Sequence, residues 1–240
     1  MVGTTMKRMG DEVTIRPADV QVRFREILQK IASDPASDAR PKTQLGPFLT
    51  VSRQVDSGGA EVAKQVGLRL GWVVFDRGLV DTLARQLDLS PELLELKDET
   101  RSNWFTDTLL NLLNSRLVLQ DSYVQMLGRI MLLAAYDGRV VIVGRGGHHF
   151  LPRDSGLRVR VVAPREVRIE RLRTRGGVST PEAVKQLREL DKNRDDFIRR
   201  HFRCRPDDPG QYDLVLDSDT FGIDGAVELV VQALKLRGIV

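Results

Sequence analysis

The sequence has one cysteine, Cys204, and three histidines, two of which are adjacent. A single cysteine cannot form an internal disulfide, which excludes a disulfide-stabilised scaffold and fits a reducing compartment such as the cytoplasm. With only one cysteine and three histidines, two of them adjacent, the chain does not show the pattern of a structural zinc site. We therefore expect a cytoplasmic protein and assign no metal ligands from the sequence.

Long apolar runs are missing as well. No window approaches the roughly 18 apolar residues that a membrane-spanning helix needs. Lys7 and Arg8 are not followed by the apolar stretch of a signal peptide. The net charge of +4 is compatible with an anionic ligand, but it does not by itself indicate nucleic acid. We expect neither a membrane nor a nucleic acid as partner.

What the chain does have is an alternation of short apolar runs with helical patterns. Its length of 240 residues and apolar content of 41% suit one large α/β domain. Helices alternating with strands throughout predict a doubly wound parallel sheet. After a first strand near residue 48, we expect strands at 72–75, 139–143, 157–162 and 213–216. Helices are expected at 79–87, from 90, at 102–136, 165–173, 180–202 and 222–236.

Residues 1–46 read as an appendage to this domain, which would span residues 47–240. Asp19 can cap a helix over residues 20–32, and the polar, proline-broken segment 33–44 then forms a linker. The helix can pack on the core, pair with a second subunit or bind a protein partner, and the sequence leaves these alternatives open. Residues 78–135 form an insertion longer than a normal crossover, as expected for a substrate-covering subdomain.

The most informative stretch is residues 47–71, a buried strand followed by a Ser/Gly-rich turn and a helix. This arrangement binds phosphates, because successive backbone N–H groups and the helix N-terminus point at the anion. The usual phosphate-binding loop reads G-x-x-x-x-G-K-[ST]. With Gly58 as its second glycine, Arg53 replaces the first glycine, Gly59 the lysine and Ala60 the hydroxyl residue.

Four loops that follow strands carry arginines. In a parallel sheet, ligands bind outside the carboxyl ends of the strands, so these loops should converge on one crevice. Several positioned cations there are what polyphosphate binding requires. The alternative is that the arginines of the helix after residue 164 face solvent. The arginines concerned are Arg53, Arg77, Arg145 and Arg168, with Arg171, Arg173 and Arg175 on the following helix.

The glycine-rich segment 144–147 and the long helix over 180–202 each allow two interpretations. The glycines can make a tight turn without a ligand, or they can give Arg145 access to the crevice. One of His148 and His149 is expected to pack or hydrogen-bond locally. On the long helix, Asp191 and Arg194 can belong to a solvated face laced with ion pairs or to a lid.

Taken together, the motifs resemble the cytidylate kinase-like family, a divergent branch of the nucleoside monophosphate kinases with the P-loop fold. The resemblance covers roughly residues 47–237. It implies a five-stranded parallel core, a helical acceptor-binding insertion and an arginine-bearing lid over residues 174–203. It also implies transfer of the γ-phosphate of ATP to a nucleoside monophosphate, with Mg²⁺. The motifs occur in order at 52–59, 75–77, 143–148, 163–164, 191–194 and 212–215.

Site residues follow from this resemblance position by position. Ser57, Gly58, Gly59 and Ala60 would hold the donor phosphates. The acceptor would be bound by Asp76, Arg77, Arg145, Asp191 and Arg194, with Arg145, Arg168 and Arg171 as the catalytic cations. Arg53, Lys64 or Arg77 would supply the positive charge of the missing lysine, and Arg53 is assigned to the donor side.

Two departures from the family pattern bear on activity. The lysine and the hydroxyl residue are absent, and Asp56 stands where this branch usually has glycine. A carboxylate there repels a triphosphate unless it acts through a metal. Three hypotheses follow: a kinase of a pyrimidine monophosphate, a nucleotide-binding regulator that has lost transfer, and a kinase of a non-nucleotide acceptor.

Overall fold

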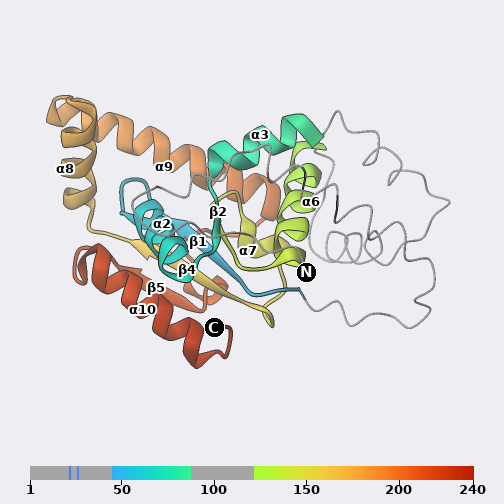
Figure 1. The fold of residues 1–240 in the computed structure, drawn as a ribbon. Helices are drawn as coiled ribbons and strands as arrows, with labels where there is room; N and C mark the ends of the chain where they lie inside the picture. Colours follow the sequence, from blue (N-terminus) through green and yellow to red (C-terminus); the bar gives the residue numbers. More distant parts are fainter. Residues whose placement is uncertain (1–21, 23–25, 27–44, 88–121) are drawn as a thin grey trace, which may run out of the picture.

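The computed structural model describes residues 45–87 and 122–240, together with Val22 and Glu26. Within these residues, five parallel strands form one sheet with helices on both faces (Figure 1). The strand order β2-β3-β1-β4-β5 confirms the expected doubly wound parallel sheet. The strands are β1 (Phe48–Arg53), β2 (Val73–Phe75), β3 (Val140–Val143), β4 (Gly156–Val162) and β5 (Leu214–Asp217).

The central strand β1 is buried on both faces. Phe48 and Leu49 are both fully buried, but they enter different clusters on opposite faces of the sheet. Successive side chains of a strand point to opposite faces, which explains why the sequence here is continuously apolar. β1 pairs with β3 on one side and β4 on the other, so Thr50 lies between Ile142 and Arg158.

Two layers of helices cover the sheet. α3 (Arg77–Leu87), α6 (Ser122–Asp137) and α7 (Gly147–Phe150) pack on one face, and α2 (Gly59–Leu70) and α10 (Gly222–Leu236) on the other (Figure 1). α8 (Arg165–Gly176) and α9 (Thr180–Phe202) lie at the carboxyl end of the sheet, and η1 (Pro209–Gln211) precedes β5. None of the helices in the described segments is long and apolar enough to cross a membrane.

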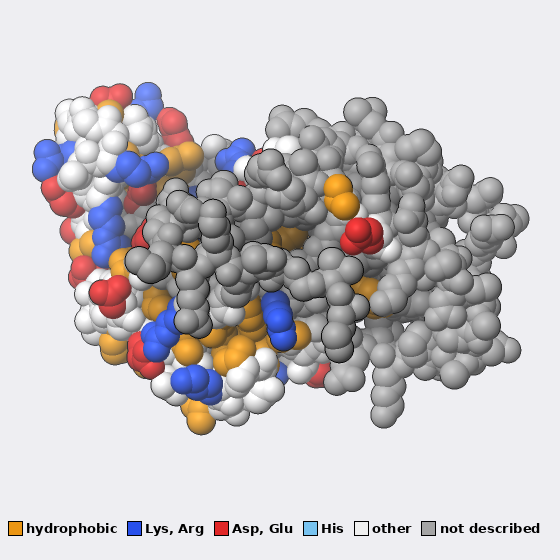
Figure 2. Space-filling model, viewed as in Figure 1, with side chains coloured by type: hydrophobic (Ala, Val, Ile, Leu, Met, Phe, Trp, Pro, Cys, Tyr) orange, Lys and Arg blue, Asp and Glu red, His pale blue; other side chains and the backbone are white. Residues whose placement is uncertain are grey.

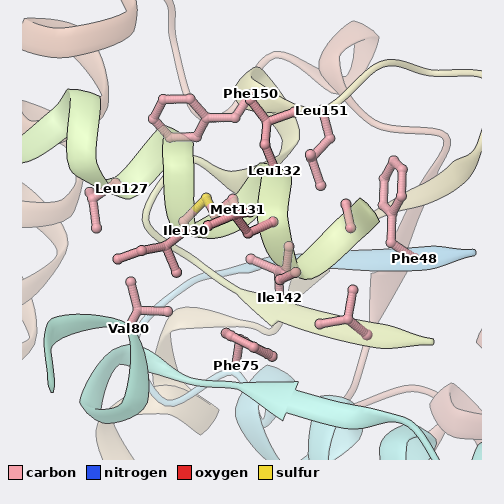
Figure 3. Packing of buried hydrophobic residues seen from close by; sticks show 14 of the residues in the cluster. Phe48, Phe75, Val80, Leu127, Ile130, Met131, Leu132, Ile142, Phe150 and Leu151 are labelled. Atoms are coloured by element: carbon pink, nitrogen blue, oxygen red, sulfur yellow. The ribbon is translucent and has the colours of Figure 1, made fainter. Parts of the chain in front are cut away.

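The first layer encloses the larger core, part of which appears in Figure 3. Ile130 and Met131 of α6 pack between Phe150 of α7 and Ile142 of β3. These side chains are almost completely excluded from water. Each Å² of apolar surface that is buried stabilises the fold by roughly 25 cal/mol. Val124 and Leu127 of α6 are fully buried as well. The part of the expected helix 102–136 before residue 122, the helix from residue 90 and the linker 33–44 lie outside the described residues.

α8 is longer than the sequence analysis predicted. A loop was expected from residue 174, but the helix continues to Gly176 and ends at Gly177, which has φ 61°. The N–H of Gly177 donates to the carbonyl of Arg173, as in a glycine-terminated helix. α9 begins at the predicted residue, with Ser179 at its N-cap and Pro181 in its first turn.

A third, smaller apolar cluster joins α8 and α9 to the loop after β1. Val55 of that loop packs with Ile169 and Leu172 of α8 and with Ala183 and Leu187 of α9. The two helices are therefore anchored on the segment that the sequence identifies as phosphate-binding. This cluster sets the position of their polar side chains at the carboxyl end of the sheet.

Candidate functional site

The loop of residues 54–58, here called the donor loop, joins β1 to α2. Asp56 and Gly58 both have left-handed backbone conformations, with φ of 53° and 78°. The hydroxyl of Ser57 is buried and lies 3.0 Å from the carbonyl oxygens of Gln54 and Val161. The loop therefore offers a ligand its backbone and the first N–H groups of α2, which lack partners within the helix.

Asp191 and Arg168 hold the donor loop in shape. One carboxylate oxygen of Asp191 accepts a hydrogen bond from the N–H of Val55 at 3.2 Å, and the other accepts from Arg168 at 2.7 Å. Arg168 is buried and also donates to the carbonyl of Val55 at 3.3 Å. These contacts fasten α8 and α9 to the loop. They occupy two residues that the resemblance assigned to substrate and catalysis.

Two further arginines of α8 reach the same loop. Arg171 donates to the backbone carbonyl of Asp56 at 3.4 Å and to the hydroxyl of Ser218 at 3.1 Å. Arg175 pairs with the Asp56 carboxylate at 3.0 Å. The negative charge expected to oppose a triphosphate is therefore partly neutralised by an arginine from the neighbouring helix.

Arg145 lies across the mouth of the site, on the loop after β3. Its guanidinium donates two hydrogen bonds to Asp81, at 2.7 and 2.9 Å, and lies 5.8 and 5.7 Å from the ring centres of Tyr123 and Phe197. Burial by itself raises the pKa of Asp81, but hydrogen bonds from Tyr123 and Arg145 outweigh it and lower that pKa. Burial, reinforced by Asp81, raises the pKa of Tyr123 to about 12.

Arg53 occupies the centre of the site. Its Cβ packs against Gly59, and its guanidinium against Gly144, where a Cβ would overlap it. Burial, followed by the positive charges of Arg194, Arg145 and Arg77, lowers the pKa of Arg53 to about 10. The group is still protonated at neutral pH. In the described part of the chain, no carboxylate or carbonyl oxygen pairs with its guanidinium.

Other predicted residues have more local partners. Asp76 caps α3, because its carboxylate accepts from the N–H of Leu79 at 2.9 Å. Arg194 donates to the backbone carbonyl of Arg53 at 3.1 Å. His148 packs and hydrogen-bonds locally, as expected, with Gln211 at 3.4 Å, and burial holds its pKa well below the usual value.

The structure thus brings Arg77, Arg145 and Arg194 within electrostatic range of Arg53. The sequence analysis missed the partners Asp81, Tyr123, Phe197 and Ser218. Only Asp81 carried a readable signal, since it lies four residues after Arg77 in the same helix and pairs with it at 3.4 Å. The other three belong to elements remote in the sequence.

The site fits phosphate groups better than it fits a metal ion ligated by the protein. Unpaired backbone N–H groups at the start of α2 and an unpaired arginine are suited to anions. The Ser57 hydroxyl is buried in the loop, and the carboxylates of Asp56, Asp76, Asp81 and Asp191 already accept from cations or N–H groups. In the described ranges, no cluster of metal-ligating side chains is present.

Two cytidylate kinases are similar to this chain in sequence. The enzyme from Thermococcus sibiricus is 33% identical over 107 residues, which is 44% of this chain and 54% of that protein. The enzyme from Archaeoglobus fulgidus is 25% identical over 207 residues, which is 80% of this chain and 96% of that protein. The match thus spans about half the length of the first and nearly all of the second.

An uncharacterised protein from Eubacterium ventriosum has a similar fold, with a TM-score of 0.61 and 18% identity, covering 80% of this chain and 98% of that one. Residues 48–220 match the sequence model of the cytidylate kinase-like family. The matched segment extends from the first residue of β1 to just beyond β5. The match includes the donor loop and every arginine of the site described above. The chain therefore belongs to the cytidylate kinase-like family.

Proposed function

We propose that this protein transfers the γ-phosphoryl group of ATP to a nucleoside monophosphate, with CMP or dCMP as the first acceptors to test. The observation that carries the proposal is that two anion-binding features lie side by side in the site. The donor loop and the start of α2 suit the donor phosphates. The arginines Arg53, Arg77, Arg145 and Arg194 gather beside them, where an acceptor phosphate would approach.

The relatives support the choice of acceptor. Two proteins of similar sequence are cytidylate kinases, and one of them aligns over nearly its whole length. ATP supplies the phosphoryl group, and Mg²⁺ would be held chiefly by the phosphate oxygens, because the nearby carboxylates are already engaged. The work of the protein is then to position and neutralise charge, which fits a site rich in arginine and poor in general bases.

The test is ADP formation from ATP with CMP, dCMP and UMP as acceptors. We expect turnover with at least one of them, and a loss of about 100-fold or more in Arg145→Ala, as is typical when a transition-state cation is removed. Arg69→Ala is the matched control, because Arg69 is an arginine at the far end of α2, where it pairs with Glu228 at 2.6 Å. No turnover by the folded protein with any monophosphate would overturn the proposal.

A second candidate is a nucleotide-binding regulator without transfer activity. The observation that favours it is the engaged hydroxyl of Ser57 together with Ala60 at the position of the usual magnesium-binding hydroxyl. Calorimetry separates the two candidates. ATP binding without ADP formation supports the regulator, whereas turnover with any acceptor supports the kinase.

A further inference from the structure

Among the described residues, the guanidinium of Arg53 has no hydrogen-bond or ion-pair partner. Each of the neighbouring arginines has at least one: Arg77 and Arg145 pair with Asp81, and Arg194 donates to a backbone carbonyl. In the described ranges, nothing comparable contacts the Arg53 guanidinium, although it is partly buried. An uncompensated charge in a desolvated position is costly, so proteins keep one there for a ligand of opposite charge.

The path of the Arg53 side chain links two glycine-rich motifs that the sequence analysis treated separately. Its Cβ would lie 2.5 Å from a Cβ added at Gly59, the first residue of α2. Its Nη1 would lie 1.8 Å from a Cβ added at Gly144, on the loop that carries Arg145. Glycine at both positions leaves room for this one side chain, which therefore runs from the donor loop toward the arginines of the acceptor side.

The other two cations that could replace the missing lysine are less suitable. Lys64 lies on the exposed face of α2 and has an interaction partner of its own. The Arg77 side chain is 73% exposed and pairs with Asp81. Arg53 is more buried than either and stands nearest to both halves of the site.

From this geometry we infer that Arg53 replaces the lysine of the usual phosphate-binding loop and binds the phosphoryl group that is transferred. The inference rests on the proposed function. In the transfer, the bond from the γ-phosphorus to its bridging oxygen breaks and the electron pair leaves with ADP. An oxygen of the acceptor phosphate forms the new bond to phosphorus. Arg53 donates N–H groups to the non-bridging oxygens throughout and neither gains nor loses a proton.

Pyrophosphate is a suitable probe, because it carries the phosphate chemistry of the donor without the nucleoside. Its dissociation constant should be measured by calorimetry, and the melting temperature with and without it, for the wild-type protein, Arg53→Met and Arg69→Met at constant ionic strength. We expect Arg53→Met to raise the dissociation constant by about tenfold or more, because charge-assisted hydrogen bonds are lost. Arg69→Met should behave as the wild type does.

Melting without ligand separates ligand binding from a structural role. If Arg53 binds a ligand, the melting temperature of free Arg53→Met equals or exceeds that of the wild type, because an uncompensated charge is removed. Pyrophosphate then raises the melting temperature of this variant much less than that of the wild type. A lower melting temperature with unchanged pyrophosphate affinity would show a structural link between α2 and the β3 loop and would overturn the inference. Arg53→Lys keeps the charge, and its expected intermediate affinity gives a test should Arg53→Met fail to fold.

Kinetics distinguish failure of this inference from failure of the proposed function. If the wild type phosphorylates a monophosphate and Arg53→Met retains its kcat, the assignment of Arg53 is wrong and the kinase stands. If pyrophosphate binding depends on Arg53 but no acceptor is turned over, the phosphate site stands and the kinase proposal fails. When both hold, we expect kcat of Arg53→Met to fall and kcat/KM for ATP to fall further, because the contact is made in the bound donor and strengthens in the transition state.

Discussion

Asp56 has two opposing effects at the donor loop. Its backbone is in the left-handed region, with φ 53°, which glycine adopts without strain and aspartate only at some cost. Its carboxylate lies where donor phosphates are expected, but Arg175 is 3.0 Å away and offsets part of the charge. Since the Arg175 side chain is 68% exposed, this ion pair contributes little to stability.

We therefore predict that Asp56→Gly raises the affinity for ATP several-fold and changes the free energy of unfolding by less than about 1 kcal/mol. Calorimetry measures the affinity, and urea unfolding measures the stability. Asp56→Asn is the control that removes the charge but keeps the size. Arg175→Met should act in the opposite direction, because it leaves the carboxylate unneutralised. Weaker ATP binding in both Asp56 variants would mean that this carboxylate assists the ligand.

The contacts of the candidate site residues were only partly predictable from the sequence. The glycines around Arg145 favoured access of this arginine to the crevice, and in the structure its guanidinium pairs with Asp81. The role of Asp191 was not predictable, because the family motif suggests an acceptor contact, whereas its carboxylate is directed at the N–H of Val55. Such a contact depends on how α9 is placed over the sheet, and no local pattern encodes that placement.

At the scale of elements, α9 is attached to the donor loop from two sides. Asp191 bonds to Val55, and Arg194 bonds to the carbonyl of Arg53 three residues further along the helix. The apolar contacts of Leu187 with Val55 reinforce this attachment. A helix tied in this way positions the loop, so changes in α9 should reach the phosphate site without touching a ligand.

We predict that Asp191→Ala destabilises the protein by about 2–4 kcal/mol, because it leaves the buried Arg168 without its carboxylate and Val55 without an acceptor. Urea unfolding tests this value, and hydrogen exchange of the donor-loop amides should become faster. Asp196→Ala is a suitable control, since Asp196 is exposed on the same helix. Equal stability of the two variants would contradict a clamping role for Asp191.

The boundaries of the elements were predictable where local signals are strong. α9 and α10 begin and end at the predicted residues, because Ser179 and Pro181 mark one start and Gly222 the other. α8 runs three residues beyond its predicted end, since Gly176 remains helical and Gly177 provides the cap. The four-residue α7 was not predicted, because a single turn is too short to show a helical period.

For the whole molecule, the alternation of strands and helices was enough to predict the parallel sheet. The strand order was not contained in that pattern, because a strand buried on both faces reads the same whatever its neighbours are. The resemblance to a kinase family implied five parallel strands, and their order is seen only in the structure. Charge distribution is likewise a property of the assembled fold: on the surface, Lys and Arg are mixed with Asp and Glu over the α8 end (Figure 2).

Opposite charges offset one another over that end, whereas the site gathers several arginines around Arg53. Burial and the positive charges of Arg194, Arg145 and Arg77 lower the pKa of Arg53, which records an excess of positive charge around that residue. We predict that the dissociation constant for ATP rises about threefold to tenfold between ~50 and ~300 mM KCl, because salt screens the attraction between these charges and the phosphates. Isothermal calorimetry over a salt series measures this dependence.

The slope of that dependence should change with the charge at the centre of the site. Arg53→Met removes one cation from the group, so its affinity should depend less steeply on salt than that of the wild type. Arg69→Met removes one charge outside the site and should leave the slope unchanged, although the net charge of both variants is the same. If both variants showed the same reduced salt dependence, the attraction for ATP would come from the net charge of the whole surface and not from the arginines of the site.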